Sequence, residues 1–256
     1  MTFHDWIFSI YPPNAAINGR YGALHITTII LCVCAIALIA CLRNRNEKSR
    51  SRIIQLLAAG IFVLEVARRI INLSRGEISD LSGMAYVLIP RPWCAISCWL
   101  TMYTALRRKT WLYNFSAMNS LLCALVFFAY PSVGFNHNVI LFENFYSIAT
   151  HSLLLVCSVS MMTLGLTNFR YDSREVRNCL VLLAGVFLYA AAEILLGIEP
   201  DPLYFMPGSE VQDFLGVSYP VFLVIYVTFL SLYFNAFYLL QKHLPHLKKS
   251  PVVSAQ

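Results

Sequence analysis

The chain alternates between long apolar segments and short polar ones. Each apolar segment has about 20 residues or more, enough for a helix to cross the hydrocarbon layer of a membrane. A water-soluble bundle needs a polar stripe on every outer helix, and stretches such as 26–40 and 222–232 have none. The pattern therefore predicts an all-α, polytopic membrane bundle of seven transmembrane helices. The predicted spans are 22–42, 53–74, 84–106, 111–130, 142–166, 178–197 and 219–241.

The basic residues predict how these spans are oriented. Fourteen of the nineteen Lys and Arg residues follow the first, third, fifth and seventh spans, whereas Arg20 and Arg75 lie in the loops on the opposite side. Because cytoplasmic loops carry the excess of Lys and Arg, the N-terminus is predicted outside and the C-terminus in the cytoplasm. The net charge of +6 then reflects topology and contact with anionic inner-leaflet lipid, and it requires no nucleic-acid partner.

The composition and the chain ends indicate three parts. With 58% hydrophobic and 12% charged residues, the chain is too apolar for an ordinary soluble domain. Residues 1–21 carry several aromatic side chains and are interpreted as an N-terminal segment lying in the outer membrane interface. Residues 22–241 are predicted to form the seven-span membrane domain, and 242–256 a cytoplasmic tail.

The cysteines and short motifs give no indication of a cofactor. All eight cysteines fall within or at the ends of predicted spans, so most are interpreted as small packing residues and no disulfide framework is expected. The chain has no CxxC, HExxH, Walker or GxGxxG motif. The sequence therefore predicts no metal site and no nucleotide or other cofactor.

Cys94 and His151 are the candidate chemical groups. Each lies about ten residues into its span from the outer end, which at about 1.5 Å per residue places both near the middle of the membrane. Taken alone, Cys94 is more commonly a packing residue, whereas an imidazole at that depth needs a hydrogen-bond partner. A thiol beside an imidazole is the minimum for an activated nucleophile. The matching depths predict contact between the two if the third and fifth spans adjoin.

Other polar residues gather in the outer half of the predicted bundle. Ionisable groups avoid lipid and pair inside bundles, so these residues are expected to border a polar cavity open to the outside and to bind the substrate. The candidates are His25, Glu65, Arg69, Arg91, Asn144 and Glu193.

Each candidate also has a structural alternative. Glu65 and Arg69 are four residues apart on one helix, and such a pair can simply ease insertion into the membrane. His25 and Glu193 lie close to the membrane surface, where a hydrated side chain is ordinary. Asn144 lies two turns before His151 on the same face, and we expect it to orient the imidazole.

Two prolines precede Cys94 in the third span. Pro90 and Pro92 must distort the helix and release backbone groups, which favours a helix that lines a cavity over one that faces lipid. Arg91 or Arg69 near Cys94 would favour its thiolate form.

Several short motifs resemble those of the YwaF-type integral membrane proteins, across roughly residues 21–240. The motifs are Tyr21-Gly22-Ala23-Leu24-His25, Ile89-Pro90-Arg91-Pro92-Trp93-Cys94, Pro131-x-x-Gly134, Thr150-His151-Ser152-Leu153, Pro202-Leu203-Tyr204-Phe205-Met206-Pro207, Asp213-Phe214-Leu215-Gly216 and Tyr219-Pro220. The chain departs from that pattern at two places. Pro92 stands where the bacterial family usually has a His, and Glu193 stands in a region where it often has Asn and aromatic residues.

The resemblance implies a function and a location. The YwaF-type family is related to a mammalian polytopic enzyme that moves fatty acyl chains between phospholipids, and more distantly to androgen-induced fatty-acid-ester hydrolases. It implies a Cys nucleophile and a His base, which align with Cys94 and His151, and a place in a bacterial cell membrane.

The residues and the resemblance together predict a membrane-embedded lipid acyltransferase or acyl-ester hydrolase. A phospholipid or another acyl lipid is the expected partner, with Arg69 and Arg91 holding its phosphate or the developing oxyanion. The alternative is a membrane protein that binds or transports a lipid or small molecule without catalysis. A thiol in contact with the imidazole would favour the enzyme, and a thiol facing lipid the alternative.

Overall fold

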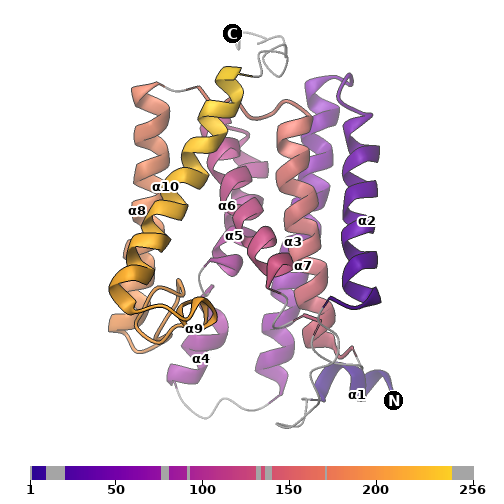
Figure 1. Cartoon of the computed structure of the whole chain (residues 1–256). Coiled ribbons are helices and arrows are strands. Elements are labelled where there is room, and N and C mark those ends of the chain that lie inside the picture. The colour runs from indigo at the N-terminus through magenta and orange to yellow at the C-terminus, as the bar shows by residue number, and fades with distance from the viewer. Residues whose placement is uncertain are drawn as a thin grey trace. The chain divides into compact units, whose positions relative to one another are not determined.

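The protein is helical throughout the part of the chain that the structure describes. The computed structural model describes residues 2–9, 21–75, 81–90, 93–130, 134–135, 140–170 and 172–243, and these contain helices and connections but no strand. The predicted all-α class is therefore confirmed (Figure 1). Residues 10–20 of the predicted interfacial segment and 244–256 of the predicted tail lie outside the described residues.

The chain divides into two compact units, Met1–Leu166 and Thr167–Gln256. The helices of the first unit are α1 (Phe3–Phe8), α2 (Ala23–Ala40), α3 (Glu47–Ser74), α4 (Leu81–Leu88), α5 (Cys94–Arg107), α6 (Thr110–Ala129) and α7 (Phe142–Thr163). Those of the second unit are α8 (Ser173–Leu195), α9 (Glu210–Leu215) and α10 (Tyr219–His243).

Helix α6 is the centre of the first unit. It packs against α5 and α7, α3 packs against the same two helices, and α2 packs on α7. Of the most apolar stretch of α6, 78% is buried inside the protein, against 11% for α2. Small polar residues join α5 to α6, with Thr101 Oγ1 2.9 Å from Ser120 Oγ and 3.3 Å from Ser116 Oγ. Small polar residues at a helix interface allow close approach and hydrogen bonding, which suits packing inside a membrane.

Helix α1 is fixed to the start of α7. The Trp6 indole donates to the Ile140 carbonyl at 2.8 Å and packs edge-on against Phe142. The Arg75 guanidinium, just after α3, donates to the Ile7 carbonyl at 2.9 Å. The aromatic segment predicted in 1–21 thus contains a short helix, and its position in the membrane interface stays a prediction.

The second unit is two long helices with a folded connection. The Asp201 carboxylate accepts hydrogen bonds from the backbone N–H groups of Phe205 and Met206, and the Tyr226 hydroxyl donates to the Leu203 carbonyl at 2.9 Å. Phe205 packs against Phe187 of α8 and against Tyr226 of α10. The connection is therefore packed onto both helices of its own unit.

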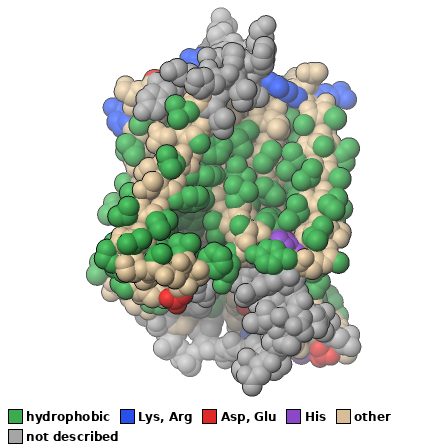
Figure 2. All heavy atoms as spheres, in the orientation of Figure 1, with side chains coloured by type: hydrophobic (Ala, Val, Ile, Leu, Met, Phe, Trp, Pro, Cys, Tyr) green, Lys and Arg blue, Asp and Glu red, His purple; other side chains and the backbone are tan. Residues whose placement is uncertain are grey.

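Five described helices are long and apolar enough to cross a membrane: α2, α6, α7, α8 and α10. On the face seen in Figure 2, apolar side chains cover the sides of the helices. On α2 many of these side chains are exposed, among them Ile26, Ile30, Leu31, Val33 and Leu38. A helix with such a surface requires lipid or a partner around it.

The other two predicted spans take a different form. Residues 53–74 belong to the 28-residue helix α3, which carries Glu65, Arg68 and Arg69 within its apolar part. Residues 84–106 were predicted as one continuous span, but the structure has two helices, α4 ending at Leu88 and α5 beginning at Cys94. Pro90 lies between the two helices. Proline lacks a backbone N–H and disfavours a helical conformation in the residue before it, so the helix ends here. The number of seven spans and the side of each terminus stay predictions.

Within the first unit, two basic loops lie at one end. The Arg50 guanidinium donates to the Leu164 carbonyl after α7, and the Gln55 amide donates to the Ala105 carbonyl at 3.2 Å. These contacts bring the first turns of α3, the end of α5 and the end of α7 together.

Candidate active site

Cys94 is the first residue of α5, directly after the segment that separates α4 from α5. The first intrahelical hydrogen bond of α5 runs from the Ser97 N–H to the Trp93 carbonyl at 3.0 Å. By helix geometry, the N–H groups of residues 94–96 have no partner within the helix, and the positive end of the helix dipole lies at this point. A thiol at a helix N-terminus is in a place that favours its thiolate form.

His151 of α7 contacts Cys94. Its Nε2 atom lies 3.2 Å from the Cys94 sulfur, and its Nδ1 atom lies 2.7 Å from the Ser147 carbonyl oxygen. A carbonyl oxygen can only accept, so Nδ1 carries the hydrogen in this contact. In the neutral imidazole Nε2 is then the unprotonated nitrogen, and it faces the thiol as a hydrogen-bond acceptor. The contact expected from the matching depths is present, while the catalytic roles stay a prediction.

The imidazole is held flat against Phe127 of α6. The two rings are stacked, with centroids 4.0 Å apart and planes 7° from parallel. Phe127 is buried and also packs against Phe128 and Phe135. A ring fixed on one face and hydrogen-bonded at Nδ1 keeps Nε2 directed at the sulfur.

Replacing Gly134 with alanine should destabilise this arrangement. An added Cβ would lie 2.4 Å from Phe127 Cζ and 3.1 Å from Ile148 Cγ1. Phe127 is already packed on His151, so the added atom overpacks the unit, at a typical cost of about 1–3 kcal/mol. Thermal unfolding in detergent measures the loss.

Gly185→Ala is the matched control for this prediction. An added Cβ at that position of α8 meets nothing within 4 Å, so the variant should unfold at or slightly above the wild-type temperature. Equal unfolding temperatures for Gly134→Ala and Gly185→Ala would show that Phe127 is not tightly packed.

A neutral polar network lies on the other side of Cys94. The Ser97 hydroxyl donates to the Trp93 carbonyl at 2.6 Å and accepts from the Asn119 amide at 2.6 Å. Its oxygen lies 3.0 Å from the sulfur of Cys123, which in turn is within hydrogen-bonding reach of Cys94. Because the Ser97 hydrogen is used by Trp93, the Cys123 thiol is the donor to Ser97.

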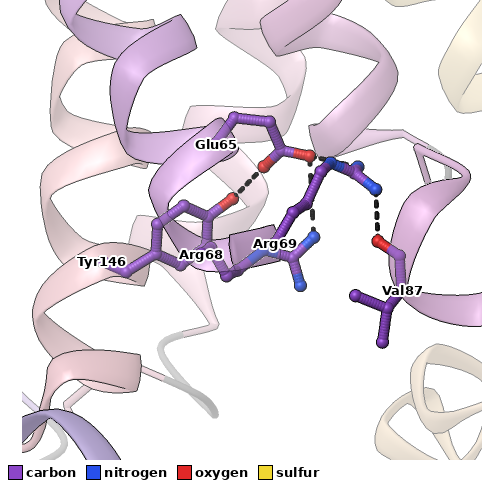
Figure 3. Close-up of polar contacts among 5 residues, drawn as sticks. All are labelled: Glu65, Arg68, Arg69, Val87 and Tyr146. Carbon is purple, nitrogen blue, oxygen red and sulfur yellow. Dashed lines mark hydrogen bonds and ion pairs between the residues drawn. The ribbon is translucent and has the colours of Figure 1, made fainter. Parts of the chain in front are cut away.

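Glu65 is the centre of a buried ionic cluster beside this site (Figure 3). Its side chain is fully buried and accepts hydrogen bonds from the Arg69 guanidinium and the Tyr146 hydroxyl. Arg68 NH2 lies 3.6 Å from the same carboxylate. Tyr146 lies five residues before His151 on α7, and the Arg69 guanidinium lies 5.9 Å from the ring of Trp99, which is five residues after Cys94 on α5. Buried charges require such partners.

The other predicted site residues have varied surroundings. His25 is buried among aromatic rings, 4.6 Å from Phe135 and 5.9 Å from Phe128 between centroids. Asn144 was expected to orient the His151 imidazole, but its amide donates to the Gly134 carbonyl at 3.2 Å. The Nδ1–H group of His151 donates to the Ser147 carbonyl instead. The substrate-binding role predicted for these residues stays a prediction.

Two predicted site residues do not belong to the described part of the first unit. Glu193 is buried near the end of α8, in the second unit. Arg91, like Pro92, lies outside the described residues. Among the described residues, no three or more His, Cys, Asp and Glu side chains form a group that would hold a metal ion.

Four residues of the site were missed by the sequence reasoning. They are Ser97, Asn119, Cys123 and Phe127. Three are uncharged polar or thiol side chains, a residue type that is common in packed membrane helices and so carries little sequence signal of its own. The polar residues Ser97, Thr101 and Thr104 repeat at helical spacing on α5, which was an available signal.

The chain belongs to the TMEM164 family. The family model matches residues 20–238, which includes both candidate residues and all helices except α1 and the end of α10. The family match and the five long apolar helices identify an integral membrane protein. No curated protein and no solved structure matches the chain. The resemblance to the YwaF-type proteins is not tested by these comparisons.

Proposed function

We propose that this protein is a membrane-embedded lipid acyltransferase or acyl-ester hydrolase. Cys94 is the nucleophile and His151 the general base, in a polar cavity open to the outer side of the membrane. The observation that carries the proposal is the 3.2 Å contact between His151 Nε2 and the Cys94 sulfur, with Nδ1 on a carbonyl. This contact puts the basic nitrogen on the thiol, as activation of a cysteine requires.

The reaction begins with transfer of the Cys94 proton to His151 Nε2. The thiolate attacks the carbonyl carbon of an acyl ester, and the carbonyl oxygen becomes an oxyanion. The N–H groups at the start of α5 are donors suited to this oxyanion. The intermediate collapses to a thioester on Cys94, and the released alkoxide takes the proton from His151. The products of this half are a lysolipid and an acylated protein.

The second half regenerates the thiol. His151 takes a proton from the acceptor, whose oxygen attacks the thioester carbonyl. With a lysolipid hydroxyl as the acceptor the product is a new acyl lipid, and with water it is a fatty acid. The Cys94 thiolate then recovers the proton from His151. The Ser147 carbonyl stabilises the imidazolium in both halves, because it accepts from Nδ1–H.

Several features support a lipid as the substrate. The TMEM164 family match and the exposed apolar faces of α2 place the chain in a membrane, where acyl chains are available laterally. We propose a cell membrane, with the N-terminus outside and the C-terminus cytoplasmic, because the basic residues follow alternate spans. A phospholipid or another acyl lipid is the proposed partner.

The test is an acyl-transfer assay on the purified protein. The protein is given a phosphatidylcholine with one labelled acyl chain and an unlabelled lysophosphatidylethanolamine. Labelled phosphatidylethanolamine is the product expected of a transferase, and labelled fatty acid the product expected of a hydrolase. Cys98→Ala, a change of a buried thiol one turn further along α5, should keep the activity. Lipid that binds without forming either product would instead support a non-catalytic binding or transport protein.

A further inference from the structure

The buried cluster on α3 holds more positive charge than its one carboxylate balances. Glu65 accepts from Arg69 and Tyr146 and lies beside Arg68, so two guanidinium groups share one carboxylate and a neutral phenol. Within the described residues the cluster therefore has a surplus of one positive charge. A buried charge without a counter-ion is strongly unfavourable.

Arg69 is held by two hydrogen bonds from its terminal nitrogens. One nitrogen donates to Glu65 and another to the Val87 carbonyl, and its guanidinium lies 5.9 Å from the centroid of the Trp99 ring. Val87 is in the last turn of α4, where carbonyl groups have no partner within the helix. Arg69 thus ties α3 to the end of α4, directly before the segment that leads to Cys94. The phosphate-binding role predicted for Arg69 therefore competes with a structural one.

Arg68 is not held in this way. Its nearest contact with Glu65 is 3.6 Å, and its Nε atom, like that of Arg69, is buried without a hydrogen-bond partner. Its guanidinium lies over the Tyr146 ring at 5.1 Å, and its side chain keeps 18% exposure. In Figure 3 the Arg69 guanidinium meets two dashed lines and that of Arg68 meets one. The Arg68 guanidinium is partly accessible, and its parallel N–H donors fit an anionic group with two or more oxygens.

Arg68 is also near the proposed nucleophile. The guanidinium of Arg69, the residue next to Arg68, lies 5.9 Å from the centroid of the Trp99 ring, and Trp99 follows Cys94 by five residues on α5. Tyr146, under the Arg68 guanidinium, precedes His151 by five residues on α7, a rise of about 7.5 Å. A ligand with an anionic group on Arg68 would therefore have its neighbouring atoms within reach of the Cys94–His151 pair.

We propose that Arg68 binds a phosphate group, and that this phosphate belongs to the glycerophospholipid whose ester Cys94 attacks. Phosphate binding by Arg68 stands alone, whereas the identification of the phosphate with that of the substrate lipid rests on the proposed function. Phosphate supplies the missing negative charge and several acceptor oxygens, whereas a neutral diacylglycerol supplies neither. Arg68 then decides between phospholipids and neutral glycerides.

Binding to a protein that cannot turn over tests this proposal apart from catalysis. The Cys94→Ala variant is titrated with dioleoyl phosphatidylcholine and, separately, with dioleoylglycerol in detergent micelles. Adding Arg68→Gln should weaken phosphatidylcholine binding about tenfold or more, since a charge-assisted contact is lost, and leave dioleoylglycerol binding unchanged. Arg68→Lys keeps the charge but not the fork and should bind with intermediate affinity. Arg107→Gln, at an exposed position at the end of α5, is the control and should change neither.

Inorganic phosphate distinguishes the two possible sources of the group. If millimolar phosphate alone raises the unfolding temperature of the wild type as much as phosphatidylcholine does, and Arg68→Lys weakens this effect, Arg68 binds free phosphate and the lipid part is overturned. If Arg68→Gln fails to fold, the same comparison on wild type and Arg68→Lys decides. The proposal is overturned if the Arg68 variants lose affinity equally for phosphatidylcholine and dioleoylglycerol, or if they lose affinity for neither. Phosphate-selective binding without acyl transfer would uphold Arg68 and contradict only the proposed function.

Discussion

Replacing Glu65 with alanine should destabilise the protein by about 3–5 kcal/mol, because the change leaves two buried guanidinium groups without a carboxylate. The Tyr146 hydroxyl would lose its acceptor at the same time. Thermal unfolding in detergent, compared with the wild type, measures the effect. Glu65→Gln keeps a carbonyl acceptor for Tyr146 but removes the charge. Its unfolding temperature should therefore lie between those of the wild type and Glu65→Ala.

A surface carboxylate provides the control for Glu65. Glu143 is exposed in the first turn of α7, where a carboxylate interacts favourably with the helix dipole, and Glu143→Ala should cost about 1 kcal/mol or less. If Glu65→Ala unfolds at the same temperature as Glu143→Ala, the cluster does not contribute to the fold as described.

Replacing Cys94 or His151 should have the largest effect on chemistry. Cys94→Ala should abolish acylation, because Cys94 is the thiol in contact with the base. His151→Ala should slow acylation by about 10²–10⁴-fold, the usual contribution of a general base, without weakening lipid binding. The rate at which a thioester appears on the protein, at saturating phospholipid, measures both effects.

The second sulfur beside the site requires its own comparison. Cys123 is within reach of Cys94 and its sulfur lies 3.0 Å from the Ser97 hydroxyl oxygen, whereas among the described contacts the thiol that meets His151 is Cys94. Residual acylation in Cys94→Ala that disappears in Cys94→Ala/Cys123→Ala would assign the nucleophile to Cys123. An unchanged rate in His151→Ala would contradict the role of the base.

The helices were predictable because hydropathy acts locally along the chain. The apolar segments at 22–42, 111–130, 142–166, 178–197 and 219–241 correspond to the five helices able to cross a membrane. The separation of α4 from α5 was foreseen as a distortion at Pro90 and not as an end of the helix. Whether a proline bends a helix or ends it depends on which groups donate hydrogen bonds to the carbonyls that lose their helical partners. Here Arg69, eighteen residues away in sequence, donates to the Val87 carbonyl.

The pairing of Cys94 and His151 was predictable from depth, whereas their surroundings were not. The expectation that Asn144 orients the imidazole followed from helical spacing, but the group in contact with Nδ1 is the Ser147 carbonyl. Backbone groups carry no sequence signal. Likewise, Arg68 and Arg69 are both within one turn of Glu65, and spacing alone does not decide which is held. The Val87 carbonyl and the Trp99 ring decide it, and both come from other helices.

The mass of the intact protein after incubation with phospholipid tests the central proposal most directly. The protein is quenched in acid during turnover, and the modified residue is located by peptide mass spectrometry. We predict an increase equal to one fatty acyl group on Cys94 that hydroxylamine removes, as expected of a thioester. Lipid bound at saturation with an unmodified Cys94 sulfur at every time point would contradict the account.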